Sequence, residues 1–213
     1  MKFSDFKNLW ENDVVWIIGS GPTIHDYNWD NISEPIFFIN DAALTIKKKS
    51  NNFYFHTHHP EVKRFQNVNA LSLWVRNREY QGITSKLKPV CLNEHILVDI
   101  VQDRRWPEKG IVINENEQFP SWAFDKDYIA KSSSLLSHCG SITTILHFLW
   151  YCGVKEVIGV GIGSDDVTLY HDGRIMDLGS NKKCDGVVKI IQNQSRYFKE
   201  FGIKCRYFDD EWI

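Results

Sequence analysis

Four groups of polar or glycine-rich residues each follow a short apolar run, and their side chains are of types that bind phosphates, bases and metal ions. Because parallel strands end at one edge of a sheet, where open α/β sheets bind ligands, the four groups predict one site. A polar loop is ordinary by itself, so the prediction depends on all four occurring at strand ends. The groups are Gly19-Ser20-Gly21-Pro22-Thr23, Asn40-Asp41, His56-Thr57-His58-His59 and the segment from Gly161 to Asp166.

The first group, residues 19–23, is the most informative. Glycines let the main chain approach a phosphate closely, and N–H groups freed there can donate hydrogen bonds to it. Ser20 and Thr23 add hydroxyl donors. No Gly-Lys-Ser/Thr follows, and His25-Asp26 occupy the region where a dinucleotide-binding loop has its third glycine. The turn is therefore of a phosphate-binding type that matches neither standard motif.

The other strand-end groups each have a functional and a plain structural interpretation. Asn40 and Asp41 would hydrogen-bond a base or ribose, or would cap a following helix. For one of His56, His58 and His59 we favour a substrate-binding or acid–base role over a zinc site, because no second group of ligands has suitable spacing. Asp165 and Asp166 would hold Mg²⁺ beside a phosphate, or are solvated loop acids.

Two later segments carry further candidates. Ser137-His138-Cys139-Gly140-Ser141 precedes a strong helical pattern, and helix N-termini attract anions, although the serines would equally cap the helix. The sequence places no base beside Cys139, so a nucleophilic role for it has no support. Tyr170-His171-Asp172-Gly173-Arg174 combines groups that suit acid–base work and phosphate binding, with an exposed polar turn as the alternative.

Strands and helices alternate along the chain, which predicts a single Rossmann-like α/β domain over 1–213, with a mostly parallel sheet flanked by helices. Continuous apolar runs at 14–18, 36–39 and 53–55 are typical of strands buried on both faces. Residues 102–135 are polar and irregular, and are predicted to form a lid or insertion. Further predicted elements are strands at 71–75, 89–92, 96–101, 156–160 and 203–208, and helices at 3–11, 41–49, 60–66, 142–150 and 187–201.

Composition excludes several classes of protein. The 213 residues carry a net charge of −2, which leaves no broad basic surface for duplex nucleic acid. No apolar run approaches the roughly 20 residues that span a bilayer, so no transmembrane segment is expected. The N-terminus does not have the pattern of a secretory signal, and five cysteines without a CxxC pair argue against a disulfide framework. We therefore predict a cytoplasmic protein, and its oligomeric state stays open.

Several stretches together resemble known families. They are Ile17-Ile18-Gly19-Ser20-Gly21-Pro22-Thr23, Phe37-Phe38-Ile39-Asn40-Asp41, Ser137-His138-Cys139-Gly140-Ser141 and the run from Gly153 to Gly161. The set resembles a Rossmann-like group that includes archaeal 6-hydroxymethylpterin pyrophosphokinases, and it is also similar to bacterial lipooligosaccharide sialyltransferases. The matching stretches lie toward the two ends of the chain, and the middle does not match clearly.

The resemblance to the sialyltransferases implies that a cytidine nucleotide is held by the first loop, by the Asn after the second strand and by the segment before the long helix. It implicates the residues at the matching positions, which are Ser20, Gly21, Thr23, Asn40, His138, Cys139 and Gly140. Two tyrosines contact phosphate in that family, and Tyr170 stands in the matching loop. The family's base is a histidine, where this chain has Asp185, with His171 upstream as a substitute.

Three functions from different classes follow. The first is a nucleotide-dependent, glycosyltransferase-like enzyme that uses a nucleotide-sugar donor and a glycan acceptor. In it, His171 or Asp185 would deprotonate the acceptor, and Tyr170 or Arg174 would stabilise the leaving phosphate. The second is a pyrophosphokinase or other phosphoryl transferase that uses ATP and Mg²⁺. The third is a module that binds a nucleotide or a protein partner without catalysis. No firm cofactor is predicted beyond the nucleotide substrate.

Overall fold

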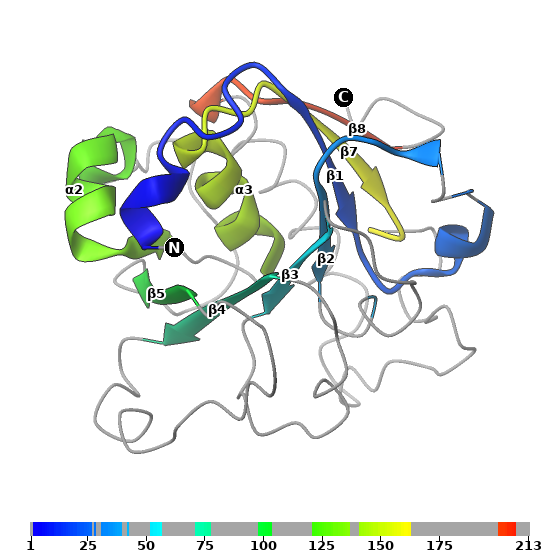
Figure 1. Ribbon diagram of the computed structural model, residues 1–213, viewed down its shortest axis with the longest axis horizontal. Helices are drawn as coiled ribbons and strands as arrows, with labels where there is room; N and C mark the ends of the chain where they lie inside the picture. Colours follow the sequence, from blue (N-terminus) through cyan, green and yellow to red (C-terminus); the bar gives the residue numbers. More distant parts are fainter. Residues whose placement is uncertain are drawn as a thin grey trace, which may run out of the picture.

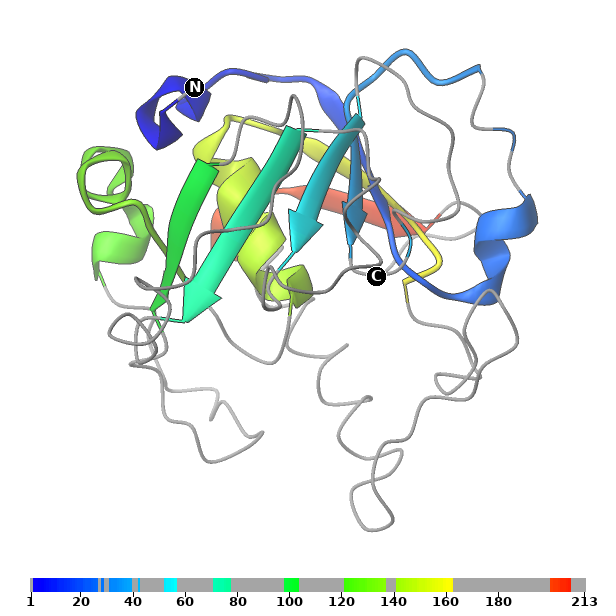
Figure 2. The same cartoon turned by 60° about the horizontal axis from the view of Figure 1, so that its bottom comes forward.

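The structure of the chain, a computed structural model, describes residues 2–26, 28, 31–39, 42, 52–56, 71–77, 98–103, 121–136, 141–162 and 200–207. These residues form one sheet of eight strands, and every pairing is parallel (Figures 1 and 2). The strands are β1 (Val14–Ile18), β2 (Ile36–Ile39), β3 (Asn52–His56), β4 (Leu71–Asn77), β5 (Val98–Asp103), β6 (Ser134–Leu136), β7 (Glu156–Val160) and β8 (Lys204–Tyr207). The predicted α/β, Rossmann-like fold class is confirmed.

The direction in which successive strands are added across the sheet changes once, after β6. Strands β1 to β6 follow one another outward across the sheet, and the chain then returns to place β7 on the other side of β1, followed by β8. Strand β1 is thus flanked by β2 and β7, which continue the sheet in opposite directions. This reversal is the topological switch point, where α/β sheets commonly bind ligands.

The central strands are buried on both faces, as their continuous apolar sequences predict. In β1, Val15 and Ile17 belong to one hydrophobic cluster, whereas Trp16 and Ile18 belong to a second cluster across the sheet. Because successive side chains of a strand point to opposite faces, each face needs an apolar residue at every second position. An uninterrupted apolar run is the result, as expected for a parallel sheet covered on both sides.

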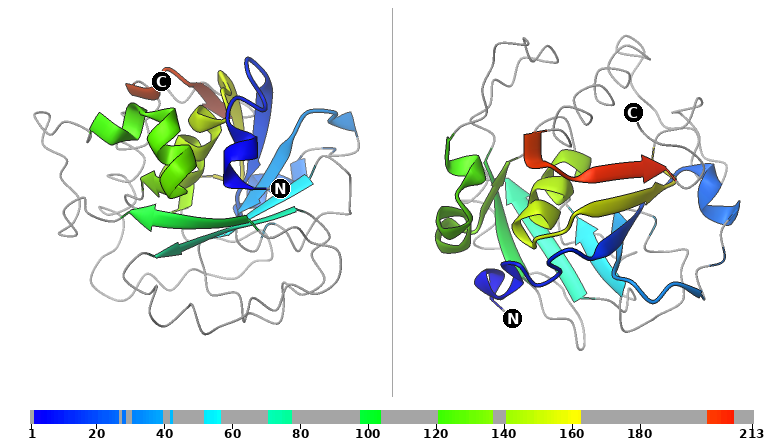
Figure 3. Two further views of the ribbon diagram at one scale, coloured as in Figure 1. Left: turned by 60° about the vertical axis from the view of Figure 1, so that its left-hand side comes forward. Right: turned by 90° about the horizontal axis from the view of Figure 1, so that it is seen from above.

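The larger cluster lies between the sheet and three helical segments, η1 (Phe3–Phe6), α2 (Lys126–Ser132) and α3 (Ser141–Tyr151), which lie on the same side of it (Figure 3). Aromatic rings dominate this cluster. The Trp10 ring packs edge-on against Phe37 and Phe53, with centroids 5.3 and 5.0 Å away. Large rings bury much apolar area, so this contact joins the N-terminal segment firmly to β2 and β3.

The structure confirms part of the helix predicted at residues 3–11. Phe3, Phe6 and Trp10 are all buried on one side, as expected for the predicted helix. Only residues 3–6 are helical, however, and they form a 3-10 turn. Lys7 leaves the helical conformation with a ψ of 116°, Asn8 follows with a left-handed φ of 57°, and the N–H of Asn8 donates to the carbonyl of Tyr151 at 3.2 Å.

Part of the segment predicted to be a lid or insertion, residues 102–135, belongs instead to the fold. Strand β5 extends to Asp103, and the chain from 121 onward forms η7 (Ser121–Phe124), α2 and β6. The Asp125 carboxylate caps α2 by accepting hydrogen bonds from the N–H groups of Asp127 and Tyr128 at 2.9 and 3.0 Å. These elements are too short to show a clear hydrophobic period, which is why the sequence pattern misses them. Residues 104–120 lie outside the described part of the chain.

Other predicted elements are confirmed only where the structure describes them. The strand expected at 156–160 is β7 with the same bounds, and those expected at 71–75, 96–101 and 203–208 correspond to β4, β5 and β8 with shifted ends. The helix expected at 142–150 is α3, which ends before Gly153 with a positive φ of 86°. The expected helices at 41–49 and 60–66, the strand at 89–92 and most of the helix at 187–201 fall outside the described residues. No helix within the described segments is both long and apolar enough to cross a membrane.

A buried histidine that the sequence reading did not single out joins three of these elements. His147, on α3, accepts a hydrogen bond at Nδ1 from the N–H of Leu136 in β6 at 2.9 Å. Its Nε2 therefore carries the proton, which it donates to the carbonyl of Ala123 in η7 at 2.8 Å. The ring stacks on Trp150, with centroids 5.7 Å apart. Burial lowers the pKa of His147 to about 4, so the ring is neutral at pH 7.

This low pKa predicts a pH-dependent loss of stability. An unfolded histidine has a pKa near 6.5, so the unfolded chain binds the proton more tightly than the folded one. The stabilisation is complete above pH 6.5 and falls as the pH drops toward 4, by about 3 kcal/mol in total. Urea unfolding of the wild type and of His147→Gln, compared between pH 7.5 and 4, measures this term. If both proteins lose the same free energy of unfolding over that range, His147 is not its source.

Candidate ligand-binding site

The candidate site lies where β1, β2 and β7 end, at the carboxyl edge of the sheet beside the switch point. Ile18, the last residue of β1, pairs with Phe38 on one side and with Val160 on the other. The three strands therefore end at nearly the same level, and the chain leaves all of them at the same edge (Figure 2). Gly19 and Gly161 are the first residues beyond β1 and β7.

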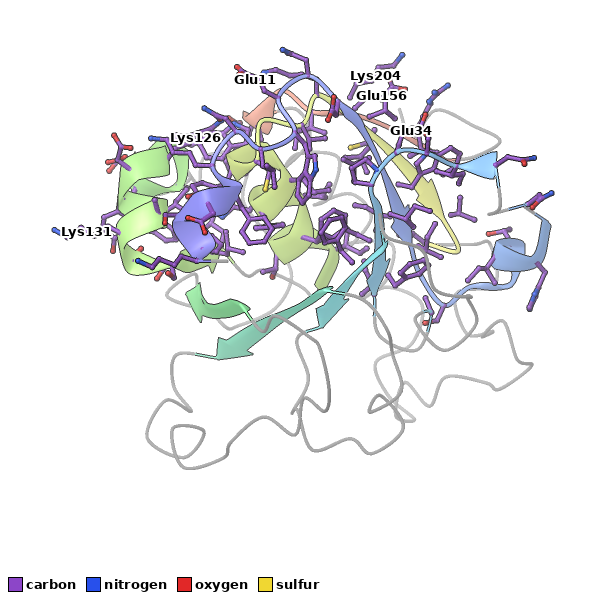
Figure 4. All side chains as sticks on the ribbon, viewed as in Figure 1. Glu11, Glu34, Lys126, Lys131, Glu156 and Lys204 are labelled. Atoms are coloured by element: carbon purple, nitrogen blue, oxygen red, sulfur yellow. The ribbon has the colours of Figure 1, made fainter. Side chains whose placement is uncertain are left out.

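The opposite edge of the sheet carries exposed charges (Figure 4). Glu156 and Lys204 are the first residues of β7 and β8, and Glu11 and Glu34 lie ahead of β1 and β2. Glu156 forms an ion pair there with Arg206, with Oε1 and Nε 2.7 Å apart. Arg206 is exposed and Glu156 half-buried, and ion pairs near solvent contribute little to stability, so we regard this edge as a solvated surface.

Three hydrogen bonds connect the loop after β1 to the end of β7. The N–H of Gly19 donates to the carbonyl of Val160, and the N–H of Gly21 donates to that of Gly161, both at 2.8 Å. In the opposite direction, the N–H of Gly161 donates to the hydroxyl Oγ1 of Thr23 at 2.9 Å. We call these residues, Gly19 to Thr23 with Val160 and Gly161, the glycine clasp.

The clasp brings two main chains so close that no side chain fits between them. A Cβ atom on Gly19 would lie 2.3 Å from the carbonyl oxygen of Gly161, and one on Gly21 would lie 2.9 Å from the same atom. Gly161 itself has a φ of +64°, and its Cβ would lie 2.8 Å from the carbonyl oxygen of Gly19. All of these contacts are with main-chain atoms, which cannot rotate away as the end of a flexible side chain can. The Gly-x-Gly pattern is therefore explained by packing within the chain.

The loop does not have the free main-chain N–H groups on which its predicted phosphate binding was based. The N–H groups of Gly19 and Gly21 were expected to be free, but both are used by carbonyl groups of the β7 end. Pro22 has no N–H, and it begins the 3-10 turn η2 (Pro22–Asp26). Within the described residues, neither the amide nor the hydroxyl of Ser20 has a hydrogen-bond partner, and the Thr23 hydroxyl, which accepts from Gly161, keeps a hydrogen that it can donate. Nucleotide binding at these residues stays a prediction.

The structure describes few of the other predicted site residues. His56 is the last residue of β3, two residues beyond Tyr54, which pairs with Phe38, so its backbone lies at the same edge; its side chain is outside the described part. The remaining predicted residues also lie outside it. They are Asn40, Asp41, His138, Cys139, Gly140, Asp165, Asp166, Tyr170, His171, Arg174 and Asp185.

Titratable groups near the core do not form a second reactive centre. Burial raises the pKa values of the Cys152 and Cys205 thiols well above the usual range, so both stay protonated and unreactive. Among the described residues, no three His, Cys, Asp or Glu side chains gather in a way that could hold a metal ion. The described chemistry of the site is thus confined to the clasp.

Comparisons with known proteins identify no family. No family model matches the chain, and no curated protein matches it. The resemblance to the pterin pyrophosphokinase group therefore gains no support. Among solved structures, the chain is similar to the sialyltransferase CST-II, solved in complex with a trisaccharide acceptor and CMP. The TM-score is 0.48 at 11% sequence identity, and the match covers 92% of this chain and 80% of that one. At this distance the match carries no argument about function.

Three glycine substitutions separate close contact from backbone conformation. Gly202 has nearly the same φ as Gly161, +63°, but nothing lies within 4 Å of its Cβ position. Gly202→Ala should therefore cost about 1–2 kcal/mol, the left-handed penalty alone. Gly19 has no positive φ, so Gly19→Ala should cost about 1–3 kcal/mol from overpacking alone. Gly161→Ala combines both penalties.

Chemical denaturation of the three variants at pH 7.5 gives the three free energies of unfolding. The expected order places Gly161→Ala as the least stable, well below its matched control Gly202→Ala. Equal destabilisation of Gly161→Ala and Gly202→Ala would mean that the close contact in the clasp contributes nothing.

Proposed function

We propose that the chain is a nucleotide-dependent transferase, glycosyltransferase-like, that takes a nucleotide sugar as donor and binds it at the carboxyl edge of the sheet. The observation that carries the proposal is the switch point between β1 and β7, flanked on both sides by parallel strands. In open α/β sheets, the crevice outside the strand ends at this point is the usual nucleotide site. Both strands end here in glycines that bring their main chains together.

The clasp supports this location in a second way. Its three hydrogen bonds hold the loop after β1 in place before any ligand arrives, so binding would not have to order this loop. Ser20 then lies at the tip of a rigid turn, with a free amide and hydroxyl among the described residues. A hydroxyl both donates and accepts, which suits the sugar and base of a nucleotide as well as its phosphate.

The proposed reaction transfers the sugar to an acceptor hydroxyl. A base removes the hydroxyl proton, the acceptor oxygen bonds to the anomeric carbon, and the bond from that carbon to the phosphate oxygen breaks. The nucleotide leaves with the electron pair. On sequence grounds, His171 or Asp185 is the base, and Tyr170 or Arg174 stabilises the charge on the leaving phosphate.

Ligand binding to the native state must raise the melting temperature, which provides the test. At a ligand concentration 100 times Kd the stabilisation is about 2.7 kcal/mol. For a chain of this size, each kcal/mol of stabilisation raises the melting temperature by roughly 2–4 °C. We expect a shift with CMP, UDP and their sugars without added metal. Ser20→Ala should reduce the shift at subsaturating ligand. Ser33→Ala, an exposed serine ahead of β2 at the opposite edge, is the matched control and should keep the full shift.

Two other results would replace the proposal. A shift that requires both ATP and Mg²⁺ would favour a pyrophosphokinase or other phosphoryl transferase, with Asp165 and Asp166 as metal ligands. Absence of a shift with every nucleotide and nucleotide sugar would favour a module that binds a protein partner. Binding that is unaffected by Ser20→Ala would move the site away from the β1 loop.

A further inference from the structure

We infer that Thr23 is a positioning residue, which holds the end of β7 in the conformation that the ligand site requires. The inference rests on the proposed function for its ligand, but not for its geometry. The Thr23 hydroxyl accepts a hydrogen bond from the N–H of Gly161, at 2.9 Å, although 138 residues separate the two in sequence. Sequence reasoning instead assigned Thr23 as a hydroxyl donor to the nucleotide.

Among the described residues, Thr23 is the one side chain that contributes a hydrogen bond to the clasp. The other two bonds join main-chain groups, in which the loop after β1 donates to the carbonyls of Val160 and Gly161. The Thr23 bond runs in the reverse direction, and it satisfies the first N–H beyond β7. The pairing of β7 with β1 ends at Val160, and Gly161 has left the extended conformation, with a φ of +64°.

Removing this acceptor would change more than one bond. A partly buried N–H without a partner costs free energy, so the chain would move to bring Gly161 to water or to another acceptor. Thr23 thus fixes the direction in which the main chain leaves β7 at Gly161. We assign to it the role of coupling the β1 loop to the β7 side of the site.

A pair of substitutions tests the role. Thr23→Val keeps the shape of the side chain and loses the acceptor, whereas Thr23→Ser keeps the acceptor. The first readout needs no ligand: exchange of the Gly161 amide hydrogen with solvent, followed by NMR in selectively ¹⁵N-glycine-labelled protein. We expect Thr23→Val to lose at least tenfold protection at Gly161 and Thr23→Ser to keep it. The amide of Gly202, which has a similar φ outside the clasp, should not change.

The second readout is the affinity for CMP, measured by calorimetry at a temperature at which all variants are fully folded. Loss of one hydrogen bond corresponds to about a tenfold change in Kd, which we expect for Thr23→Val. Thr23→Ser should stay within about twofold of the wild type. The positioning role predicts both effects together, and the serine variant should rescue both.

Each contrary result has its own meaning. Lost protection at Gly161 with an unchanged Kd would make Thr23 a structural residue alone. A weakened Kd with Gly161 still protected would make it a direct ligand contact. Either result overturns the inference. A wild-type protein that binds no nucleotide would contradict the proposed function, whereas an unchanged exchange rate of Gly161 in Thr23→Val would overturn the Thr23 assignment whether or not a nucleotide binds.

Discussion

The main-chain contact between the loop after β1 and the end of β7 is the constraint on which the site depends. It exists because three positions, Gly19, Gly21 and Gly161, have no Cβ atom to separate the chains. The contact joins the ends of β1 and β7, the two strands at which the strand order reverses, at the carboxyl edge of the sheet. The loop after β1 and the end of β7 cannot move apart without losing three hydrogen bonds. Their contact therefore fixes the main chain at the centre of the candidate site.

The packing of the sheet explains why the polar chemistry is at its edge. Strand β1 has Val15 and Ile17 in one hydrophobic cluster and Trp16 and Ile18 in the other, so no position within it can carry a polar group to a ligand. His147 shows what a polar group in this core requires. Both of its ring nitrogens are hydrogen-bonded to main-chain groups, and it is held in its neutral form. A group so fully satisfied positions η7 and β6 and has no capacity left for a substrate.

The fold was largely predictable, because a strand buried on both faces leaves an uninterrupted apolar run such as 36–39. The short elements α2 and β6 were not, since seven- and three-residue segments are specified by contacts distant in sequence, such as that between His147 and Leu136. In the site, the Gly-x-Gly pattern correctly marked a turn with unusual backbone demands. It could not reveal that the demand comes from Gly161, because nothing local connects positions so far apart in the chain.

This distinction bears on the kind of ligand that the site can recognise. A phosphate-binding loop works because its amide hydrogens point outward with no partner in the protein. Here the amides of Gly19 and Gly21 point to carbonyl groups of the β7 end, and the amide of Gly161 points to Thr23. The loop after β1 therefore lacks two of the free amides on which such a phosphate site relies. The groups of the described loop that can still donate include the amide and hydroxyl of Ser20 and the hydroxyl of Thr23, so hydroxyl groups replace part of the usual row of amides.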